Sequence, residues 1–380
     1  MVALLEGLFL KISALFMSLI ISAGTTFGAF VAPTTTAAAN YRDTKIKNVI
    51  YLIGDGMGFN HLEKTKSERK IELVMDTVAI RGEAMTRSLT NKVTDSAASG
   101  TALATGVRTY NGAIGVYLTD SLDVVSHPKN LTELCLERGM KTGVITSDET
   151  SGATPSAFSA HESNRDKAEG ITEDQLNSKI DIIWGTQNGV ATKEAANSKG
   201  FKYVTTYDEM MALEEGSRSF AQFTNDLWTV EQSDKNTPNL EQMAEKAIDL
   251  LDDTDEGFFL MIEGAHIDKH SHSNEDENMT EALMEFDKVI DYVLDYAEKD
   301  GETLVIITAD HETGAITKEG DGYVFTSGSH SAANVPILVY GSDKLIENGE
   351  VINNYEIPIR IAYTLGFTED EFPCEVMVAA

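Results

Sequence analysis

Short apolar runs alternate with longer segments of helical period along most of the chain. The apolar runs are NVIYLIGDG (residues 48–56), KTGVITSDE (141–149), GFFLMIEGAH (257–266), TLVIITADHE (303–312) and VPILVYG (335–341). Their centres lack the polar residue at every second position that marks a half-exposed strand. Such runs are typical of strands buried on both faces of a sheet.

Helical patterns stand between these runs, in NLTELCLERGM (130–140), TPNLEQMAEKAIDLLDD (237–253) and ENMTEALMEFDKVIDYVLDYAEKD (277–300). Alternating strands and helices predict an α/β fold, a three-layer sandwich with a mostly parallel central sheet flanked by helices on both faces. Residues 165–238 are polar and poorly periodic, so we expect an irregular insertion or cap there. We expect residues 40–380 as a whole to form a single domain.

The N-terminal region reads as an export signal. Residues 12–39 carry no charge and end in three alanines, a small-residue pattern suited to cleavage. We therefore predict that residues 1–39 are a cleaved signal and that the protein is periplasmic or extracellular, without stable membrane contact. The apolar run is also long enough to span a bilayer, so a retained anchor is the alternative.

The net charge of −31 argues against binding to nucleic acid or to an anionic membrane. An anionic substrate would need strong local positive charge. The chain has two cysteines. Cys135 lies in a helical pattern and is expected to be a packed thiol, although a disulfide with Cys374 remains possible.

Acidic residues collect where the predicted strands end. Asp55, Glu263 and Asp310 each follow an apolar run directly, and Asp148 and Glu149 end another. Ligands of such folds bind beyond the carboxyl ends of the strands. Acids gathered at one edge repel one another unless they are protonated or bound to cations. The pattern therefore favours a cation site.

The loop IGDGMG could instead be a nucleotide-binding turn. A dinucleotide loop needs the spacing G-x-G-x-x-G, whereas the glycines here are Gly54, Gly56 and Gly58. Asp55 would also face the phosphates with its own charge. We favour a metal-binding Asp55 on a tight turn over a nucleotide loop or a simple solvated turn.

Histidines supply the remaining candidate ligands. Asp268 and His272 are four residues apart, so one helical turn places both on one face. His266 and His270 stand in the same segment, and hydrogen-bonded or outer roles suit them better. Each motif alone is weak, since a loop histidine such as His330 is usually just solvated. Together the segments hold enough nitrogen and oxygen ligands for two divalent ions with open positions: Asp55, Asp268, His272, Asp310, His311 and His330.

Ser96, in VTDSAASGTALATG, is the candidate nucleophile. It precedes an alanine-rich segment and so stands at a helix N-terminus, where free amides and the helix dipole favour an oxyanion or phosphate. The plainer alternative is that Thr94, Asp95 and Ser96 serve only as helix caps. No histidine is near in sequence to act as a base, but a metal ion lowers the pKa of a hydroxyl group.

Six segments occur in order: IGDGMG, TDSAASGTALATG, GATPSAFSAHESNR, IEGAHIDKHSH, ADHETG and HSAANVP. They resemble the signature segments of the bacterial alkaline phosphatases, over most of residues 47–341. The resemblance implies hydrolysis of small-molecule phosphate monoesters through a covalent phosphoserine. It further implies two zinc ions and one magnesium ion per chain, and a homodimer.

The resemblance also assigns roles to matching positions. One zinc activates the hydrolytic water and takes up charge on the leaving oxygen, while the second ionises the nucleophile. Ser96 is the nucleophile and Arg165 grips the phosphate; Asp268, His272 and His330 hold the first zinc; Asp310, His311 and Asp55 hold the second; Asp55, Thr154 and Glu263 hold magnesium.

One position departs from the family pattern. Two residues before Thr154 the family has Asp or His, and this chain has Gly152. Glycine offers no side chain to a metal or its water. We therefore expect either that Thr150, Ser151 or solvent compensates, or that the magnesium site is weak and differently occupied. Lys269 also occurs in some relatives and is expected to reach phosphate through water.

Two alternatives remain. A phosphodiesterase or sulfatase of the same superfamily would have a threonine, or a modified Cys or Ser in a C/S-x-P-x-R context, whereas this chain has Ser96 followed by two alanines. A non-catalytic phosphate- or metal-binding protein would not need a nucleophile at all. Loss of turnover in Ser96→Ala would separate an enzyme from such a scavenger.

Overall fold

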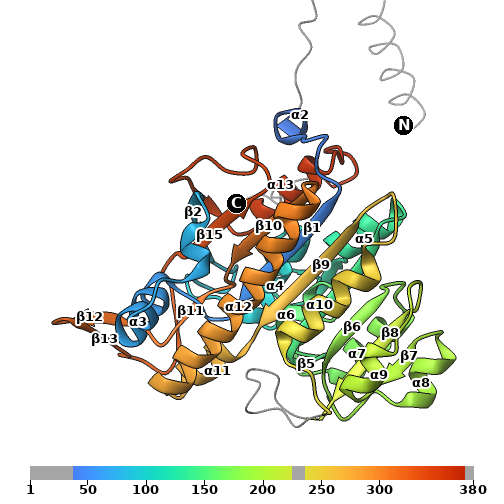
Figure 1. Ribbon diagram of the computed structural model, residues 1–380, viewed down its shortest axis with the longest axis horizontal. Coiled ribbons are helices and arrows are strands. Elements are labelled where there is room, and N and C mark those ends of the chain that lie inside the picture. The colour runs from blue at the N-terminus through green and yellow to red at the C-terminus, as the bar shows by residue number, and fades with distance from the viewer. Residues whose placement is uncertain (1–36, 225–235, 373–380) are drawn as a thin grey trace, which may run out of the picture. The chain divides into compact units, whose positions relative to one another are not determined.

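A 10-stranded sheet forms the centre of the structure, a computed structural model that describes residues 37–224 and 236–372 (Figure 1). Among these strands β15 alone is reversed, since it pairs antiparallel with β10 and β2 while the other neighbours pair in parallel. The predicted mostly parallel α/β sandwich is confirmed. From edge to edge the strands are β16 (Val351–Asn353), β2 (Ile80–Met85), β15 (Val335–Tyr340), β10 (Thr303–Thr308), β1 (Asn48–Gly54), β9 (Phe258–Gly264), β5 (Lys141–Glu149), β6 (Ile182–Thr186), β8 (Ser219–Phe223) and β7 (Lys202–Val204).

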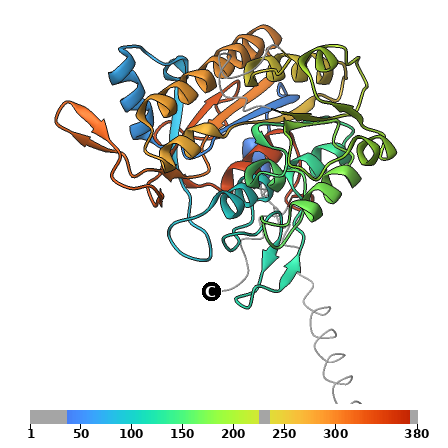
Figure 2. The ribbon, with the colours of Figure 1, turned by 90° about the horizontal axis from the view of Figure 1, so that it is seen from below.

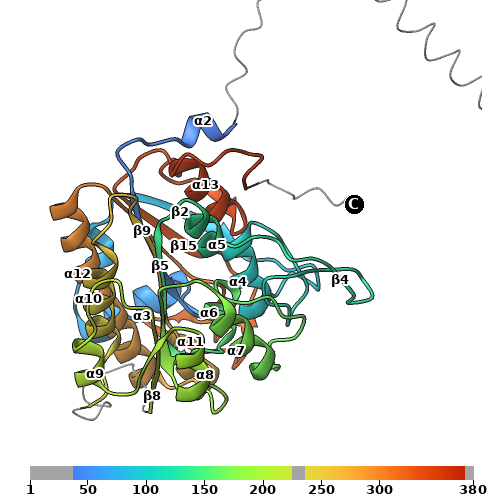
Figure 3. The ribbon, with the colours of Figure 1, turned by 90° about the vertical axis from the view of Figure 1, so that its right-hand side faces the viewer.

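Helices cover both faces of this sheet (Figure 3). One face carries α3 (Phe59–Arg69), α10 (Leu240–Leu251) and α12 (Asp276–Asp300), and the other carries α4 (Ser96–Thr105), α5 (Leu131–Glu137), α6 (Ala153–Ala157) and α7 (Ala168–Asn177). Every residue of β1, β9 and β10 is buried, which explains why their centres are apolar on both faces. The remaining helical segments are α2 (Ala37–Tyr41), η1 (Val74–Thr77), α8 (Lys193–Ser198), α9 (Tyr207–Met211), α11 (His266–His272) and α13 (Glu356–Thr364).

Three two-stranded ribbons lie outside the sheet. The hairpins β3–β4 (Tyr117–Leu118, Val124–Ser126) and β12–β13 (Thr317–Glu319, Gly322–Val324) extend beyond the helical layers (Figure 2). The third ribbon pairs β11 (Glu312–Thr313) with β14 (His330–Ser331) and contributes to the candidate site.

The segment expected to be an irregular insertion is regular where it is described. It contains α7, α8 and α9, and its strands β6, β7 and β8 extend the central sheet beyond β5. Polar side chains hid this strand signal, because they lie inside the sheet and are hydrogen-bonded there. Trp184 Nε1 donates to Ser219 Oγ at 2.9 Å, and Gln222 Nε2 donates to Thr150 Oγ1 at 2.6 Å.

Two expectations concern the chain ends and the cysteines. The predicted signal, residues 1–39, lies outside the described residues except for its last three positions, and Cys374 lies outside as well. Cys135 is buried on α5, as expected for a packed thiol, and burial raises its pKa. Of the described helices, none is long and apolar enough to cross a membrane.

Candidate active site

The carboxyl ends of β1, β9 and β10 meet at one edge of the sheet. Ile53 of β1 is in register with Glu263 of β9 and with Thr308 of β10. Asp55 and Asp310 each lie two residues beyond these register positions. The acidic strand ends predicted from the sequence are therefore neighbours in space.

His330 reaches the same edge because β15 is reversed, so the residues before β15 lie where the parallel strands end. Thr308 Oγ1 at the end of β10 donates to Pro336 O at the start of β15, at 2.8 Å. The ribbon β11–β14 then pairs Thr313 with His330. The reversed direction of β15 thus brings His330, which precedes a strand, to the acids that follow strands, Asp55 and Asp310.

The turn after β1 requires glycine at position 56. Gly56 has φ 74°, and a Cβ atom there would lie 2.9 Å from Asp268 Cα. Its backbone N donates to Asp310 Oδ1 at 3.1 Å. The glycine therefore lets the turn carrying Asp55 pass close to α11 and to the end of β10.

Two groups of side chains bring ligand atoms within 4.8 Å of one another, and His311 belongs to both. One group is Asp55, Asp310 and His311; the other is Asp268, His311 and His330. His311 Nε2 lies 3.6 Å from Asp55 Oδ1 and 3.1 Å from Asp310 Oδ2. His330 Nε2 lies 3.6 Å from Asp268 Oδ1. Carboxylate and imidazole groups so arranged are ordinary zinc ligands.

His272 completes the set of six predicted ligands. It ends α11, one turn after Asp268, and its Nε2 lies 3.4 Å from Asp268 Oδ2. The same nitrogen is 3.1 Å from His330 Nε2. His266 and His270 contact other partners instead, a serine of β5 and the glutamate that precedes α12.

The hydrogen bonds of His330 and His272 show which ring nitrogen carries the proton and which one has a lone pair for a metal ion. His330 Nδ1 lies 2.9 Å from Thr94 O, and His272 Nδ1 lies 2.8 Å from Gly328 O. A carbonyl oxygen can only accept, so Nδ1 carries the proton in both rings. Both rings therefore present the Nε2 lone pair to the site, which is the usual arrangement of a metal-binding histidine.

A threonine orients the third imidazole in the same way. Thr313 Oγ1 contacts Asp268 Oδ1 and lies 3.2 Å from His311 Nδ1. The hydroxyl has one proton, which it donates to the carboxylate, so it accepts from His311 Nδ1. Nε2 of His311 is then also a lone pair that faces the acids.

The acids of this cluster fit a divalent cation. Asp55 Oδ1 and Asp310 Oδ2 are buried, and neither accepts a hydrogen bond from any described residue. Burial, together with the charges of neighbouring acids, raises the pKa of Asp55 well above its usual value, and burial raises that of Asp310. Burial and His330 hold the pKa of His311 well below its usual value. Buried carboxylates beside neutral imidazoles gain most from a bound cation, which offsets their mutual repulsion.

Glu263 and Thr154, the predicted magnesium ligands, lie on the β5 side of this cluster. Thr146 of β5 is in register with Glu263, and its hydroxyl donates to the Glu263 carboxylate. Burial, then the charge of Asp148, raises the pKa of Glu263 to about 8 although the Thr146 bond lowers it. The Thr154 hydroxyl oxygen is buried without a partner of hydrogen-bond geometry among the described residues, yet it lies close enough to Glu263 to affect that pKa.

Ser96 is the first residue of α4, with Asp95 as the N-cap that accepts from Ala98 N. The Ser96 hydroxyl lies 3.1 Å from His311 Nε2 and is therefore at the centre of the cluster. Arg165 Nη1 lies 3.3 Å from Asp95 Oδ2. The side chain of Arg165 is 37% exposed, so its guanidinium remains accessible beside Asp95, the residue before Ser96.

Thr150 is one of the groups expected to compensate for Gly152, and its hydroxyl already has a partner on another strand. The Thr150 hydroxyl accepts from Gln222 Nε2 and is turned toward β8. Asp148 lies beside Gly152 instead. Sequence reasoning missed the local roles of both Asp148 and Thr313. The regular strand period gives no signal for Asp148, because the pairing of β5 is irregular between Ile145 and Glu149.

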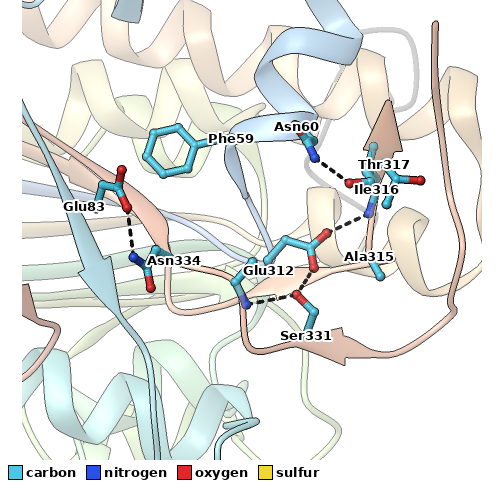
Figure 4. A pocket seen from close by; sticks show the side chains of 10 residues that line it. Phe59, Asn60, Glu83, Glu312, Ala315, Ile316, Thr317, Ser331 and Asn334 are labelled. Atoms are coloured by element: carbon cyan, nitrogen blue, oxygen red, sulfur yellow. Dashed lines mark hydrogen bonds between the residues drawn. The ribbon is translucent and has the colours of Figure 1, made fainter. Parts of the chain in front are cut away.

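A cavity of about 470 Å³ lies behind the β11–β14 ribbon (Figure 4). Glu312 and Ser331 line it, whereas the next pair in register, Thr313 and His330, belongs to the ligand cluster. Side chains of paired strands alternate between two faces. The ribbon thus separates this cavity from Ser96.

Comparisons with known proteins agree with this geometry. A family model described as alkaline phosphatase matches residues 46–188 and 172–358. Alkaline phosphatase 4 of Bacillus subtilis (strain 168) is 32% identical over 325 residues, which cover 80% of this chain and 69% of that protein. Alkaline phosphatase of Escherichia coli (strain K12) is 29% identical over 337 residues, with 71% and 70% covered.

A solved structure is similar as well. It is a histidine-to-glutamate mutant of the alkaline phosphatase from the Antarctic bacterium TAB5, with Mg bound in its M3 site. The TM-score is 0.74 at 30% identity, and the match covers 85% of this chain and 99% of that one. The chain therefore belongs to the alkaline phosphatase family and is a phosphatase.

Proposed function

We propose that this phosphatase hydrolyses phosphate monoesters through a covalent phosphoserine at Ser96. The observation that carries the proposal is the position of the Ser96 hydroxyl, 3.1 Å from His311 Nε2 at the N-terminus of α4. A hydroxyl needs activation to become a nucleophile, and the surrounding ligand groups fit two zinc ions. Zinc bound there would lower the pKa of a hydroxyl group and take up negative charge.

The side chains of this protein would then bind and orient the ester. Arg165 offers a planar fork for two phosphate oxygens, and Asp95 holds that guanidinium beside Ser96. The amides at the start of α4 favour the same dianion. Ser96 Oγ attacks phosphorus, the ester P–O bond breaks and the alcohol leaves with a proton. Water then attacks the phosphoserine, releases inorganic phosphate and restores the hydroxyl group.

The choice of a monoester over a diester rests on the charge of this site. A monoester dianion carries more charge than a diester, and Arg165 with bound cations matches it. We also propose that a magnesium ion binds at Thr154, Glu263 and Asp55. Export remains a proposal that follows from the N-terminal sequence. A homodimeric assembly remains a proposal that follows from the family.

Ser96→Ala tests the function, with Ser163→Ala as a control serine away from the ligand cluster. We expect Ser96→Ala to lose at least about a thousandfold in turnover of an aryl phosphate while it keeps its zinc content. Acid quenching of the wild type should trap phosphate on the peptide containing Ser96. Exhaustive chelation should abolish turnover, and zinc should restore it. Unchanged turnover in Ser96→Ala would overturn the proposal.

A further inference from the structure

Position 152 lacks a side chain, but the space beside it is filled. Gly152 is the N-cap of α6, with φ −53° and ψ 152°, a backbone that any residue can adopt. A Cβ atom there would lie 3.2 Å from Asp148 Oδ2 and 3.0 Å from Glu149 O. The Asp148 carboxylate therefore occupies the volume toward which a side chain at 152 would extend.

Asp148 shares a hydrogen-bonded link with Glu263. Its backbone N donates to Thr146 Oγ1 at 2.9 Å, and that hydroxyl donates to the Glu263 carboxylate. This bond lies where the pairing of β5 with β6 is irregular, between Ile145 and Glu149. Thr146 thus links the backbone of Asp148 to the carboxylate of Glu263.

Lys269 fixes the direction of the Asp148 carboxylate. Its Nζ forms an ion pair with Asp148 Oδ1, and Oδ2 is the oxygen that lies beside Gly152. Lys269 follows Asp268 on α11, so the pair ties β5 to the helix that carries the predicted zinc ligands. The buried Thr154 oxygen, which lacks a hydrogen-bond partner among the described residues, begins the helix that Gly152 caps.

We propose that Asp148 replaces, from strand β5, the side chain that position 152 lacks, so that Asp148 joins Asp55, Thr154 and Glu263 in holding a magnesium ion. Lys269 is the positioning residue that holds Asp148 in place. The inference rests on the proposed function only for the assignment of the ion as magnesium, because the position of Asp148 comes from the structure itself. Magnesium keeps several of its waters, so Asp148 serves equally well by binding the ion or by accepting from its bound water.

The test measures magnesium binding directly. Mg²⁺ is titrated calorimetrically into zinc-loaded protein without substrate, for the wild type and for Asp148→Asn, which preserves the shape but removes the charge. We expect Asp148→Asn to bind Mg²⁺ about 10- to 100-fold more weakly, with unchanged zinc content. Glu149→Gln is the matched control, because that neighbouring acid is exposed. It should bind Mg²⁺ as the wild type does.

A relocated carboxylate provides a second test. Asp148→Ala removes the Asp148 carboxylate, which lies where a side chain at position 152 would extend. Adding Gly152→Asp to this variant returns a carboxylate to the same space. We expect the double variant to recover most of the Mg²⁺ affinity that Asp148→Ala loses. Wild-type affinity in Asp148→Asn, or no recovery in the double variant, would overturn the inference. Since the titration needs no turnover, a wild type without phosphatase activity would count against the proposed function alone.

Discussion

Nδ1 of His311 lies 3.2 Å from the hydroxyl oxygen of Thr313, and the same hydroxyl contacts the Asp268 carboxylate. One buried side chain thus orients members of both candidate zinc groups. Thr313 is fully buried on the β11–β14 ribbon, so its position is fixed by pairing with His330. The geometry of the two groups is therefore coupled through Thr313, which belongs to neither group.

Replacing Thr313 by Val tests this coupling. Valine keeps the shape, but it leaves His311 Nδ1 without an acceptor and Asp268 without a donor. We expect zinc affinity to fall about 10- to 100-fold, which competition with a chelator would measure. Thr313→Ser keeps the hydroxyl and should stay close to the wild type. If Thr313→Val binds zinc as tightly as Thr313→Ser, the hydroxyl does not orient the ligands.

Much of the fold could be predicted because the central strands are buried on both faces. Strands β1, β9 and β10 are buried at every position and carry apolar residues on both faces along their centres, and this pattern is visible in the sequence. Strand β8 could not be predicted, since its Ser219 and Gln222 are satisfied by partners on other elements. The reversal of β15 was also hidden, because strand direction depends on the connection and not on composition.

The candidate site was predictable where each residue stands at a strand end or on a single helical turn. Asp55, Asp310 and the pair Asp268–His272 follow from such local rules. The placement of Asp148 beside Gly152 does not, because it depends on how the turn between β5 and α6 folds back. Sequence spacing alone does not report which volume a turn leaves empty.

Gly56→Ala should destabilise both the turn and the metal site. Alanine at a left-handed position costs about 1–2 kcal/mol, and its Cβ would also press on the backbone of Asp268, 2.9 Å away. Gly301→Ala is the matched control, since Gly301 has φ 75° and nothing within 4 Å of its Cβ position. We expect calorimetry to show a larger fall in Tm for Gly56→Ala, together with reduced zinc content. Equal losses in the two variants would show that contact with Asp268 is unimportant.

Arg165→Ala should weaken catalysis mainly through substrate binding. A charge-assisted hydrogen bond contributes about 1.5–3 kcal/mol, so kcat/KM for an aryl phosphate should fall roughly 10- to 100-fold. Inhibition by inorganic phosphate should weaken in parallel. Arg165→Lys keeps the charge without the fork and should give an intermediate loss. Lys167→Ala, which removes an exposed ion pair with Glu162, should change neither quantity. Wild-type phosphate inhibition in Arg165→Ala would exclude a phosphate-binding role.

The ion pair between His161 and Glu133 should make stability depend on pH. His161 Nε2 lies 3.0 Å from Glu133 Oε1, away from the ligand cluster. Burial opposes protonation of His161, but Glu133 outweighs it and raises the His161 pKa above 6.5. Burial likewise opposes ionisation of Glu133, and His161 outweighs it and lowers the Glu133 pKa below 4.5. Each group is therefore more readily charged in the folded state than in the unfolded state.

The sign of the effect follows from linkage. The His161 contribution is complete below pH 6.5 and is lost as pH rises through the folded pKa, whereas the Glu133 contribution is complete above pH 4.5 and is lost as pH falls. A double-mutant cycle with His161→Gln and Glu133→Gln, followed by urea unfolding with saturating metals, isolates the pair from other titrating groups. We expect a coupling energy of up to about 1 kcal/mol near pH 5.5, because Glu133 is partly exposed, and almost none near pH 8.5. Coupling that is equal at both pH values would mean that the two side chains interact without charge.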